Sequence, residues 1–325
     1  MRTTLINEYA KPMQKPSIFI ATKNAELYQE LLEDRLGRNI DITLANTQGE
    51  VVSNYGRQPV VLGRPDFLLP LLDTEPPVQW LQSTWAGVTP LAHHSFRDYQ
   101  LTGVKDVFGQ QMAEYVLTHL LAFESKLAAR IQSQSSKLWD DSLSGAIQDK
   151  TIGIMGTGSI GAAVAQTCVQ LGMRAIGFNT SGLQVAPFEK VFATDELTAF
   201  LEGCDYVVGT LPDLEATTNL LDAAAFASMK DTALLINVGR GNLIDDDALM
   251  WALEQGEIAA AVLDVFKQEP LPATDPLWTA SNLTITGHIA AVSRPDDIAR
   301  LFAENYKRFA SHQPLLHLID FDKGY

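Results

Sequence analysis

The chain has 325 residues, more than the roughly 250–300 at which a single hydrophobic core stops growing, so two domains are predicted. Its net charge of -15 repels phosphate backbones and anionic bilayers, which argues against nucleic acid or a membrane surface as a partner. Because the N-terminus lacks a continuous apolar stretch and no apolar run approaches about 18 residues, we expect a cytoplasmic protein. Its two cysteines, Cys168 and Cys204, form no metal-ligand pattern, and no metal site is expected.

The first part of the chain, to about residue 105, alternates short apolar or β-branched runs with helix-like stretches such as Glu26–Leu36. Such alternation is typical of a parallel α/β sheet, so we expect a small flavodoxin-like α/β domain here. The predicted strands are Ser17–Ala21, Ile40–Leu44, Pro59–Leu62 and Val78–Gln82.

A long amphipathic stretch from Gln110 to about Gln134 predicts one helix that bridges two domains. After Thr151 the alternation resumes and predicts a doubly wound parallel sheet, and a last helix is expected at Pro295–Ala310. The predicted strands are Thr151–Met155, Arg174–Phe178, Asp205–Thr210, Ala233–Val238, Ile258–Val265 and Leu283–Thr286. We therefore expect a discontinuous domain of residues 1–105 and 290–325, a Rossmann domain of residues 106–289, and a cleft between them.

The strand Thr151–Met155 runs directly into Gly156-Thr157-Gly158-Ser159-Ile160-Gly161, and an alanine-rich helix follows. A G-x-G-x-x-G motif between strand and helix is typical of dinucleotide sites. Gly156 would permit the tight turn, Gly158 the close approach of a pyrophosphate, and Gly161 the packing of helix on strand. The helix N-terminus, with Ser159 and Ile160, would present backbone N–H groups to the phosphates. The motif predicts a nicotinamide or related dinucleotide.

The next strand ends where the dinucleotide motif usually places an acidic residue for the adenine ribose, and Asn179-Thr180-Ser181 occupy that place. Without a carboxylate there is no repulsion toward a 2′-phosphate, and these side chains are able to hydrogen-bond to one, which favours NADP over NAD. No arginine or lysine follows directly, although arginine is the usual ligand of that phosphate. The sequence therefore does not decide between NADP, NAD and a turn without a cofactor role at this segment.

Ligands of open α/β sheets bind outside the carboxyl ends of the strands, and polar groups recur at those ends here. Arg240 lies between two glycines, so its guanidinium fits a carboxylate clamp as well as a structural ion pair. His288 follows the last strand, and Glu269 is its candidate carboxylate partner or a solvated loop charge. Reduction of a keto acid needs a proton donor at the carbonyl oxygen, a role that suits a histidine oriented by a carboxylate.

Together, six motifs in order resemble the D-isomer-specific 2-hydroxyacid dehydrogenase family, and most closely its glyoxylate/hydroxypyruvate reductase branch. They are GTGSIG at 156–161, LP at 211–212, NVGRG at 237–241, LDVF at 263–266, EPLP at 269–272 and GHIAA at 287–291. The resemblance implies that Arg240, Glu269 and His288 are the catalytic set, with His288 as general acid/base. It also implies that Asp264 holds the nicotinamide carboxamide and that the cofactor pocket is lined by Leu211, Pro212 and Val238.

By the same resemblance, the loop at Trp85, Ala86 and Gly87 would meet the substrate carboxylate from the first domain with its backbone N–H groups. Arg294 would contact the acid as well, unless it only caps the last helix, and DKGY at 322–325 also resembles the reductase branch. Family members usually form homodimers through the cofactor domain, and the helix at Gln110–Gln134 resembles the element they use.

The leading hypothesis is therefore NADPH- or NADH-dependent reduction of glyoxylate or hydroxypyruvate to the D-2-hydroxy acid. The same chemistry on a bulkier 2-keto acid is the first alternative. A non-enzymatic, NAD(H)-sensing interaction protein is the second, because this fold also serves in transcriptional corepressors. Retention of all three catalytic residues favours an enzyme.

Overall fold

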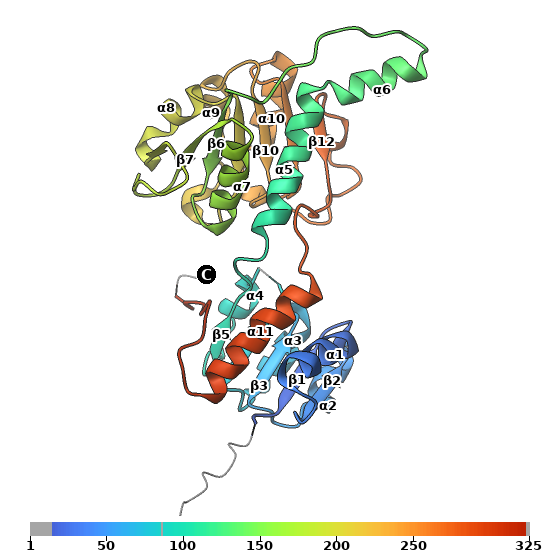
Figure 1. Cartoon of the computed structure of the whole chain (residues 1–325), viewed down its shortest axis with the longest axis vertical. Coiled ribbons are helices and arrows are strands. Elements are labelled where there is room, and N and C mark those ends of the chain that lie inside the picture. The colour runs from blue at the N-terminus through green and yellow to red at the C-terminus, as the bar shows by residue number, and fades with distance from the viewer. Residues whose placement is uncertain (1–14, 86, 323–325) are drawn as a thin grey trace, which may run out of the picture. The chain divides into compact units, whose positions relative to one another are not determined.

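The computed structural model describes residues 15–85 and 87–322 (Figure 1). The chain divides into two compact units, one of Met1–Val107 with Ser293–Tyr325 and one of Phe108–Val292. The division expected from the sequence, 1–105, 106–289 and 290–325, differs by two residues at the first crossing and three at the second. Each unit is a parallel α/β structure, so the predicted fold class is confirmed.

Within the described residues, the first unit has a five-stranded parallel sheet of order β2-β1-β3-β4-β5. Strands β1, β3 and β4 are wholly buried, which explains the apolar sequences of β1 and β3, whereas β4 also buries the polar residues Gln82 and Ser83. The strands are β1 (Ile18–Ala21), β2 (Ile42–Ala45), β3 (Val60–Gly63), β4 (Trp80–Ser83) and β5 (Gln100–Thr102). The helices are α1 (Ala25–Leu36), α2 (Gln48–Asn54), α3 (Pro65–Leu72), α4 (Thr89–Ala92) and α11 (Pro295–Ala310). After α11 the chain returns to β5, where the Ile319 N–H donates to the Leu101 carbonyl at 2.8 Å.

The second unit has a seven-stranded parallel sheet, counted over the described residues, of order β12-β11-β10-β9-β6-β7-β8. Its strands are β6 (Thr151–Met155), β7 (Arg174–Phe178), β8 (Lys190–Phe192), β9 (Tyr206–Gly209), β10 (Leu234–Asn237), β11 (Ala260–Leu263) and β12 (Leu283–Ile285). Its α-helices are α5 (Gly109–Glu124), α6 (Leu127–Ser135), α7 (Ser159–Gln170), α8 (Leu197–Glu202), α9 (Ala223–Ala227) and α10 (Asp246–Gln255). Short 3-10 turns lie at Thr194–Glu196, Glu215–Thr217, Gly241–Leu243 and Pro276–Thr279.

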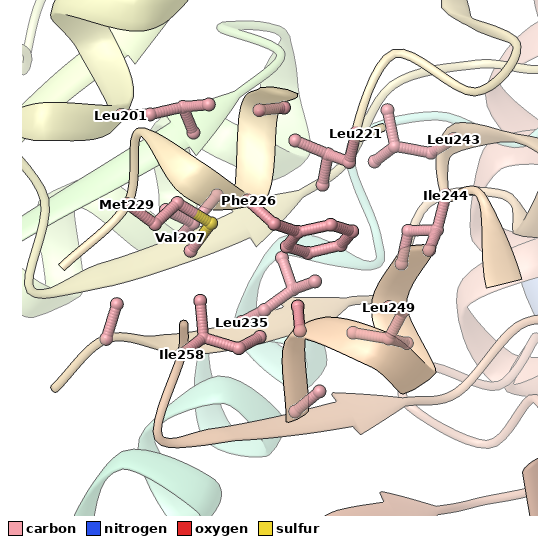
Figure 2. Packing of buried hydrophobic residues seen from close by; sticks show 14 of the residues in the cluster. Leu201, Val207, Leu221, Phe226, Met229, Leu235, Leu243, Ile244, Leu249 and Ile258 are labelled. Atoms are coloured by element: carbon pink, nitrogen blue, oxygen red, sulfur yellow. The ribbon is translucent and has the colours of Figure 1, made fainter. Parts of the chain in front are cut away.

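Hydrophobic clusters cover both faces of this second sheet. Figure 2 shows part of the cluster under α8, α9 and α10, where the fully buried Phe226 ring lies between Leu221, Leu235 and Leu249. The other cluster lies under α5 and α7 and includes Val116. Burying a phenylalanine side chain contributes about 1.5–3 kcal/mol, so these clusters fix the strands whose carboxyl ends carry the candidate site.

The expectation of one helix over Gln110–Gln134 is wrong, because the chain breaks between α5 and α6. Lys126 has a left-handed φ of 53°. Glu124, the last residue of α5, contacts residues far along the chain. Its carboxylate, 8% exposed, accepts hydrogen bonds from Lys150 and the Tyr206 hydroxyl. Its backbone carbonyl also accepts the Gly145 N–H at 2.8 Å. These long-range partners stop the helix where amphipathic periodicity alone would continue it.

Among the helices of residues 15–85 and 87–322, none is both long enough and apolar enough to cross a membrane.

Candidate active site

The glycine motif forms the turn between β6 and α7. Gly156 has a φ of 109°, and a Cβ there would lie 2.6 Å from the Thr210 hydroxyl oxygen. A Cβ on Gly161 would lie 1.9 Å from the Gly156 carbonyl oxygen, so only glycine permits this approach of helix to strand. A Cβ on Gly158 would meet nothing within 4 Å, and no described side chain caps α7. The first turn of α7 thus has no side-chain cap among the described residues, and Gly158 and Ser159 are exposed, an arrangement that fits a bound phosphate.

The Asn179 side chain, after β7, forms hydrogen bonds within its own turn and with the glycine motif, which the sequence did not predict. Its amide nitrogen donates to the Thr157 hydroxyl at 2.9 Å, and its carbonyl oxygen accepts the Ser181 and Gly182 N–H groups at 3.1 and 2.8 Å. The side chain therefore ties the β7 turn to the glycine motif. Thr180 and Ser181 are exposed beside it.

His288 and Glu269 form a hydrogen-bonded pair at the carboxyl ends of β11 and β12. His288 Nδ1 lies 2.7 Å from Glu269 Oε2, and Glu269 Oε1 accepts the Phe266 N–H at 2.9 Å. Both carboxylate oxygens are thus engaged, which fixes the carboxylate and orients the imidazole. The His288 side chain remains 50% exposed, so the ring is accessible from solvent.

Arg240 lies in the turn after β10, and buried Asn237 shapes that turn. The Asn237 side chain accepts the Gly239 N–H at 3.1 Å and donates to the Arg240 carbonyl at 2.9 Å. A Cβ on Gly241 would lie 2.0 Å from the Phe266 carbonyl carbon, so this turn packs directly on the loop that holds Glu269. The structure therefore brings the Arg240 turn and the His288–Glu269 pair to adjacent loops of one sheet edge.

Asp264, at the end of β11, anchors the loop that carries His288. Its carboxylate accepts the Thr286 hydroxyl at 2.6 Å and the Ile289 and Ala290 N–H groups at 2.8 Å each. Its backbone carbonyl accepts the His288 N–H at 2.8 Å. With 1% exposure, Asp264 is a structural anchor of the site, and its contact with a nicotinamide stays a prediction.

In the first unit, Trp85 follows β4 and is 39% exposed. Its backbone N–H donates to the Ser83 hydroxyl at 2.9 Å, so this N–H already has a partner in the loop. The Arg64 guanidinium lies 4.8 Å from the centre of the Trp85 ring, a neighbour that sequence reasoning missed. Ala86, named from the sequence, lies outside the described residues, and the role of Gly87 stays a prediction.

The other predicted residues are placed as follows. Arg294 is an exposed residue of the first unit at the N-cap position of α11, where its side chain makes no capping hydrogen bond. Val238 is buried at 4% exposure, Leu211 is half-buried and Pro212 is exposed, all in the second unit. Of the described residues, no group of three or more His, Cys, Asp or Glu has the arrangement of a metal site.

Three comparisons with known proteins bear on this site. The family model described as "D-isomer specific 2-hydroxyacid dehydrogenase, NAD binding domain" matches residues 117–290. Glyoxylate/hydroxypyruvate reductase A of Serratia proteamaculans is 35% identical over 66% of this chain and 69% of the relative. The crystal structure of a D-isomer specific 2-hydroxyacid dehydrogenase family protein from Aeromonas salmonicida is 38% identical, with a TM-score of 0.90 over 95% of this chain and 100% of that one.

A further solved structure, the D-isomer specific 2-hydroxyacid dehydrogenase from Xanthobacter autotrophicus Py2 in complex with NADPH and MES, is 26% identical. Its TM-score is 0.84 over 96% of this chain and 100% of that chain. The doubly wound sheet, the glycine turn and these matches define an NAD(P)-dependent oxidoreductase. The chain belongs to the D-isomer specific 2-hydroxyacid dehydrogenase family, on the side of the glyoxylate/hydroxypyruvate reductases, which confirms the resemblance seen in the sequence.

Proposed function

We propose that this chain reduces glyoxylate or hydroxypyruvate to the D-2-hydroxy acid with NADPH or NADH. The observation that carries the proposal is the 2.7 Å pair of His288 Nδ1 and Glu269 Oε2 on the loop next to the Arg240 turn. The Serratia proteamaculans relative, named for glyoxylate and hydroxypyruvate, supports the choice of substrates.

The nicotinamide, when bound, supplies the hydride that reaches the carbonyl carbon of the acid. Because Nδ1 of His288 is taken by Glu269, Nε2 is the ring nitrogen that donates a proton to the carbonyl oxygen. Glu269 keeps the ring oriented and stabilises its positive charge before the transfer. The Arg240 guanidinium binds the substrate carboxylate and draws electron density from the adjacent carbonyl.

We propose that the cofactor phosphates lie on the first turn of α7, against the N–H groups of Ser159 and Ile160 and the open face of Gly158. Leu211, Pro212 and Val238 follow neighbouring strands and would border the dinucleotide. We favour NADP because no carboxylate stands at Asn179-Thr180-Ser181, and the related Xanthobacter structure holds NADPH. NAD is the alternative.

Asn179→Asp tests the cofactor preference. An aspartate keeps the acceptor for the Ser181 and Gly182 N–H groups but places a negative charge beside the site of a 2′-phosphate. We expect kcat/KM for NADPH to fall about tenfold or more and the ratio of NADPH to NADH activity to reverse in favour of NADH. The measurement is initial rates with both cofactors, with Asn282→Asp as a control that adds the same charge at a turn before β12. An unchanged ratio would remove this segment from cofactor selection.

We also infer a homodimer. Helix α6 has no buried residue, and Figure 1 shows it running away from the rest of its unit. It and the following segment expose large apolar side chains, with Trp139 at 91% and Leu143 at 87%. A surface of this kind is typical of an interface. The resemblance of the helix at Gln110–Gln134 to the element through which family members form dimers supports a second copy as the partner.

Trp139→Glu is therefore expected to shift the protein from dimer to monomer, because a charge replaces the most exposed aromatic ring of this apolar surface. Light scattering after size-exclusion chromatography gives the mass. Trp251→Glu, at a half-exposed tryptophan of α10, is the matched control and should stay dimeric. A monomeric wild-type protein at all concentrations would contradict the proposal.

The experiment that tests the function compares initial rates of NADPH and NADH oxidation with glyoxylate, hydroxypyruvate, pyruvate and phenylpyruvate. We expect the two small acids, glyoxylate and hydroxypyruvate, to give the highest kcat/KM. A preference for phenylpyruvate would favour the dehydrogenase of bulkier acids, and no turnover with any acid would favour the sensing protein. On the substrate side, Trp85, Gly87 and Arg294 stay proposed contacts from the first unit.

A further inference from the structure

Tyr115 lies on α5, outside the residues that the sequence assigned to the site, yet its hydroxyl reaches the strand end before His288. The hydroxyl oxygen is 2.6 Å from Thr286 Oγ1, across 171 residues of sequence. Thr286 is the first residue after β12, two positions before His288. The contact therefore joins α5 to the loop that carries the proposed general acid.

The direction of this hydrogen bond follows from the next one. Thr286 donates its single hydroxyl proton to Asp264 Oδ1 at 2.6 Å, since an ionised carboxylate only accepts. Tyr115 must then be the donor to Thr286. Burial raises the pKa of Tyr115 to about 12, so the hydroxyl keeps its proton at physiological pH. The result is a chain of donors from Tyr115 through Thr286 to Asp264, in which each bond polarises the next.

Asp264 passes this constraint to the His288 loop. Its oxygens accept the N–H groups of Ile289 and Ala290, and its carbonyl accepts that of His288. His288 has a left-handed φ of 57°, a conformation that a histidine keeps only where its surroundings hold it. The loop conformation thus depends on how firmly Asp264 is oriented.

A second contact from the same face of α5 supports this arrangement. Gln111, four residues before Tyr115, donates to the Val292 carbonyl at 3.1 Å and accepts the Val292 N–H at 3.2 Å. Two side chains spaced by one helical turn therefore hold both ends of the segment from Thr286 to Val292. The His288 loop is fixed from two directions, by Asp264 and by α5.

We propose that Tyr115 is a positioning residue, which holds the His288 loop in its reactive conformation through Thr286 and Asp264. The inference rests on the proposed function, in which His288 Nε2 donates the proton. Within the described residues, the Tyr115 hydroxyl bonds to Thr286, while the His288 ring and the Arg240 guanidinium have other partners. Its loss should therefore lower the fraction of correctly placed His288 without weakening substrate binding.

The test is Tyr115→Phe, which removes only the hydroxyl. We expect kcat for the best 2-keto acid to fall about fivefold to tenfold, the effect of one net hydrogen bond, while KM for the acid stays within about twofold. Thr286→Val should lower kcat at least as much. The double variant should add little to Thr286→Val, because both changes break the same chain.

The matched control is Tyr306→Phe. Tyr306 also donates a 2.6 Å hydrogen bond, to the Pro16 carbonyl of the first unit, and burial likewise raises its pKa to about 12. The Tyr306→Phe protein should lose about as much thermal stability as the Tyr115→Phe protein but keep the wild-type kcat. A Tyr115→Phe protein with full kcat, or an equal loss of kcat in Tyr306→Phe, would overturn the positioning role.

Amide hydrogen exchange provides a readout that needs no turnover. The N–H groups of Ile289 and Ala290 should exchange faster in Tyr115→Phe than in the wild-type protein and be unchanged in Tyr306→Phe. Unchanged exchange in Tyr115→Phe would show that the hydroxyl does not hold the loop. If the wild-type protein turns over no 2-keto acid, the proposed function fails, and the exchange rates alone decide whether Tyr115 anchors the loop.

Discussion

His288→Ala is expected to lower kcat by about 10²–10⁴, the range typical of lost general acid–base catalysis. Hydride transfer turns the carbonyl oxygen into an alkoxide. Without the imidazole, which Glu269 and the loop hold in place, this alkoxide has no proton donor. Binding of NADPH should change little, because the dinucleotide is proposed to bind on the glycine turn of another strand. Steady-state rates and fluorescence titration of the cofactor measure the two effects separately.

A suitable control is His94→Ala, which removes another histidine paired with a carboxylate. His94 Nε2 lies 3.1 Å from Asp73 Oδ1 in the first unit, in a pair that we place outside the reaction. Activity should survive this change. If His288→Ala retained wild-type kcat, or lost cofactor binding as strongly as turnover, the histidine would have no role as acid and base.

Arg240→Met is expected to lower kcat/KM by about 10²–10⁴, because two hydrogen bonds to a charged group are lost at about 1.5–3 kcal/mol each. The effect should appear in both constants: KM rises because the carboxylate is released, and kcat falls because the carbonyl is less polarised. Methionine keeps much of the length of the side chain, so the turn shaped by Asn237 should persist.

Arg240→Lys separates charge from geometry. Lysine keeps the positive charge but not the planar pair of donors, so we expect it to recover only part of kcat/KM. Arg300→Met, at an exposed ion pair of α11 with Asp297, is the control for loss of a surface cation. A lysine variant with full activity would show that Arg240 acts as a simple charge, and an unaffected methionine variant would exclude Arg240 from the site.

The sequence predicted the fold where one signal dominated locally. The apolar strands and the glycine turn need particular residue types at fixed spacing, so β6 and β7 have the predicted bounds. Strands β5 and β8 were missed, and each has only three residues, which give little periodic signal. The equally short β12 was predicted within Leu283–Thr286. The break after α5 was missed because it depends on Glu124 contacts with residues far along the chain.

The residues of the candidate site likewise include some with a local sequence signal and some that only distant contacts bring to the site. Motifs predicted His288, Glu269 and Arg240, which lie in loops after strand ends, where ligands of such sheets bind. Nothing in the sequence around Tyr115 indicated a role at the site, because an aromatic residue on an amphipathic helix is usually a core residue. Only the fold brings its hydroxyl to Thr286. The internal use of Asn179 was likewise hidden, because its partner Thr157 is 22 residues away.

The proposed reductase activity is tested by incubating the purified protein with hydroxypyruvate and NADPH and determining the amount and configuration of the glycerate formed. We predict D-glycerate in a one-to-one ratio with the NADPH oxidised, and almost none with His288→Ala. Formation of L-glycerate, or cofactor oxidation without glycerate, would contradict the proposed reductase.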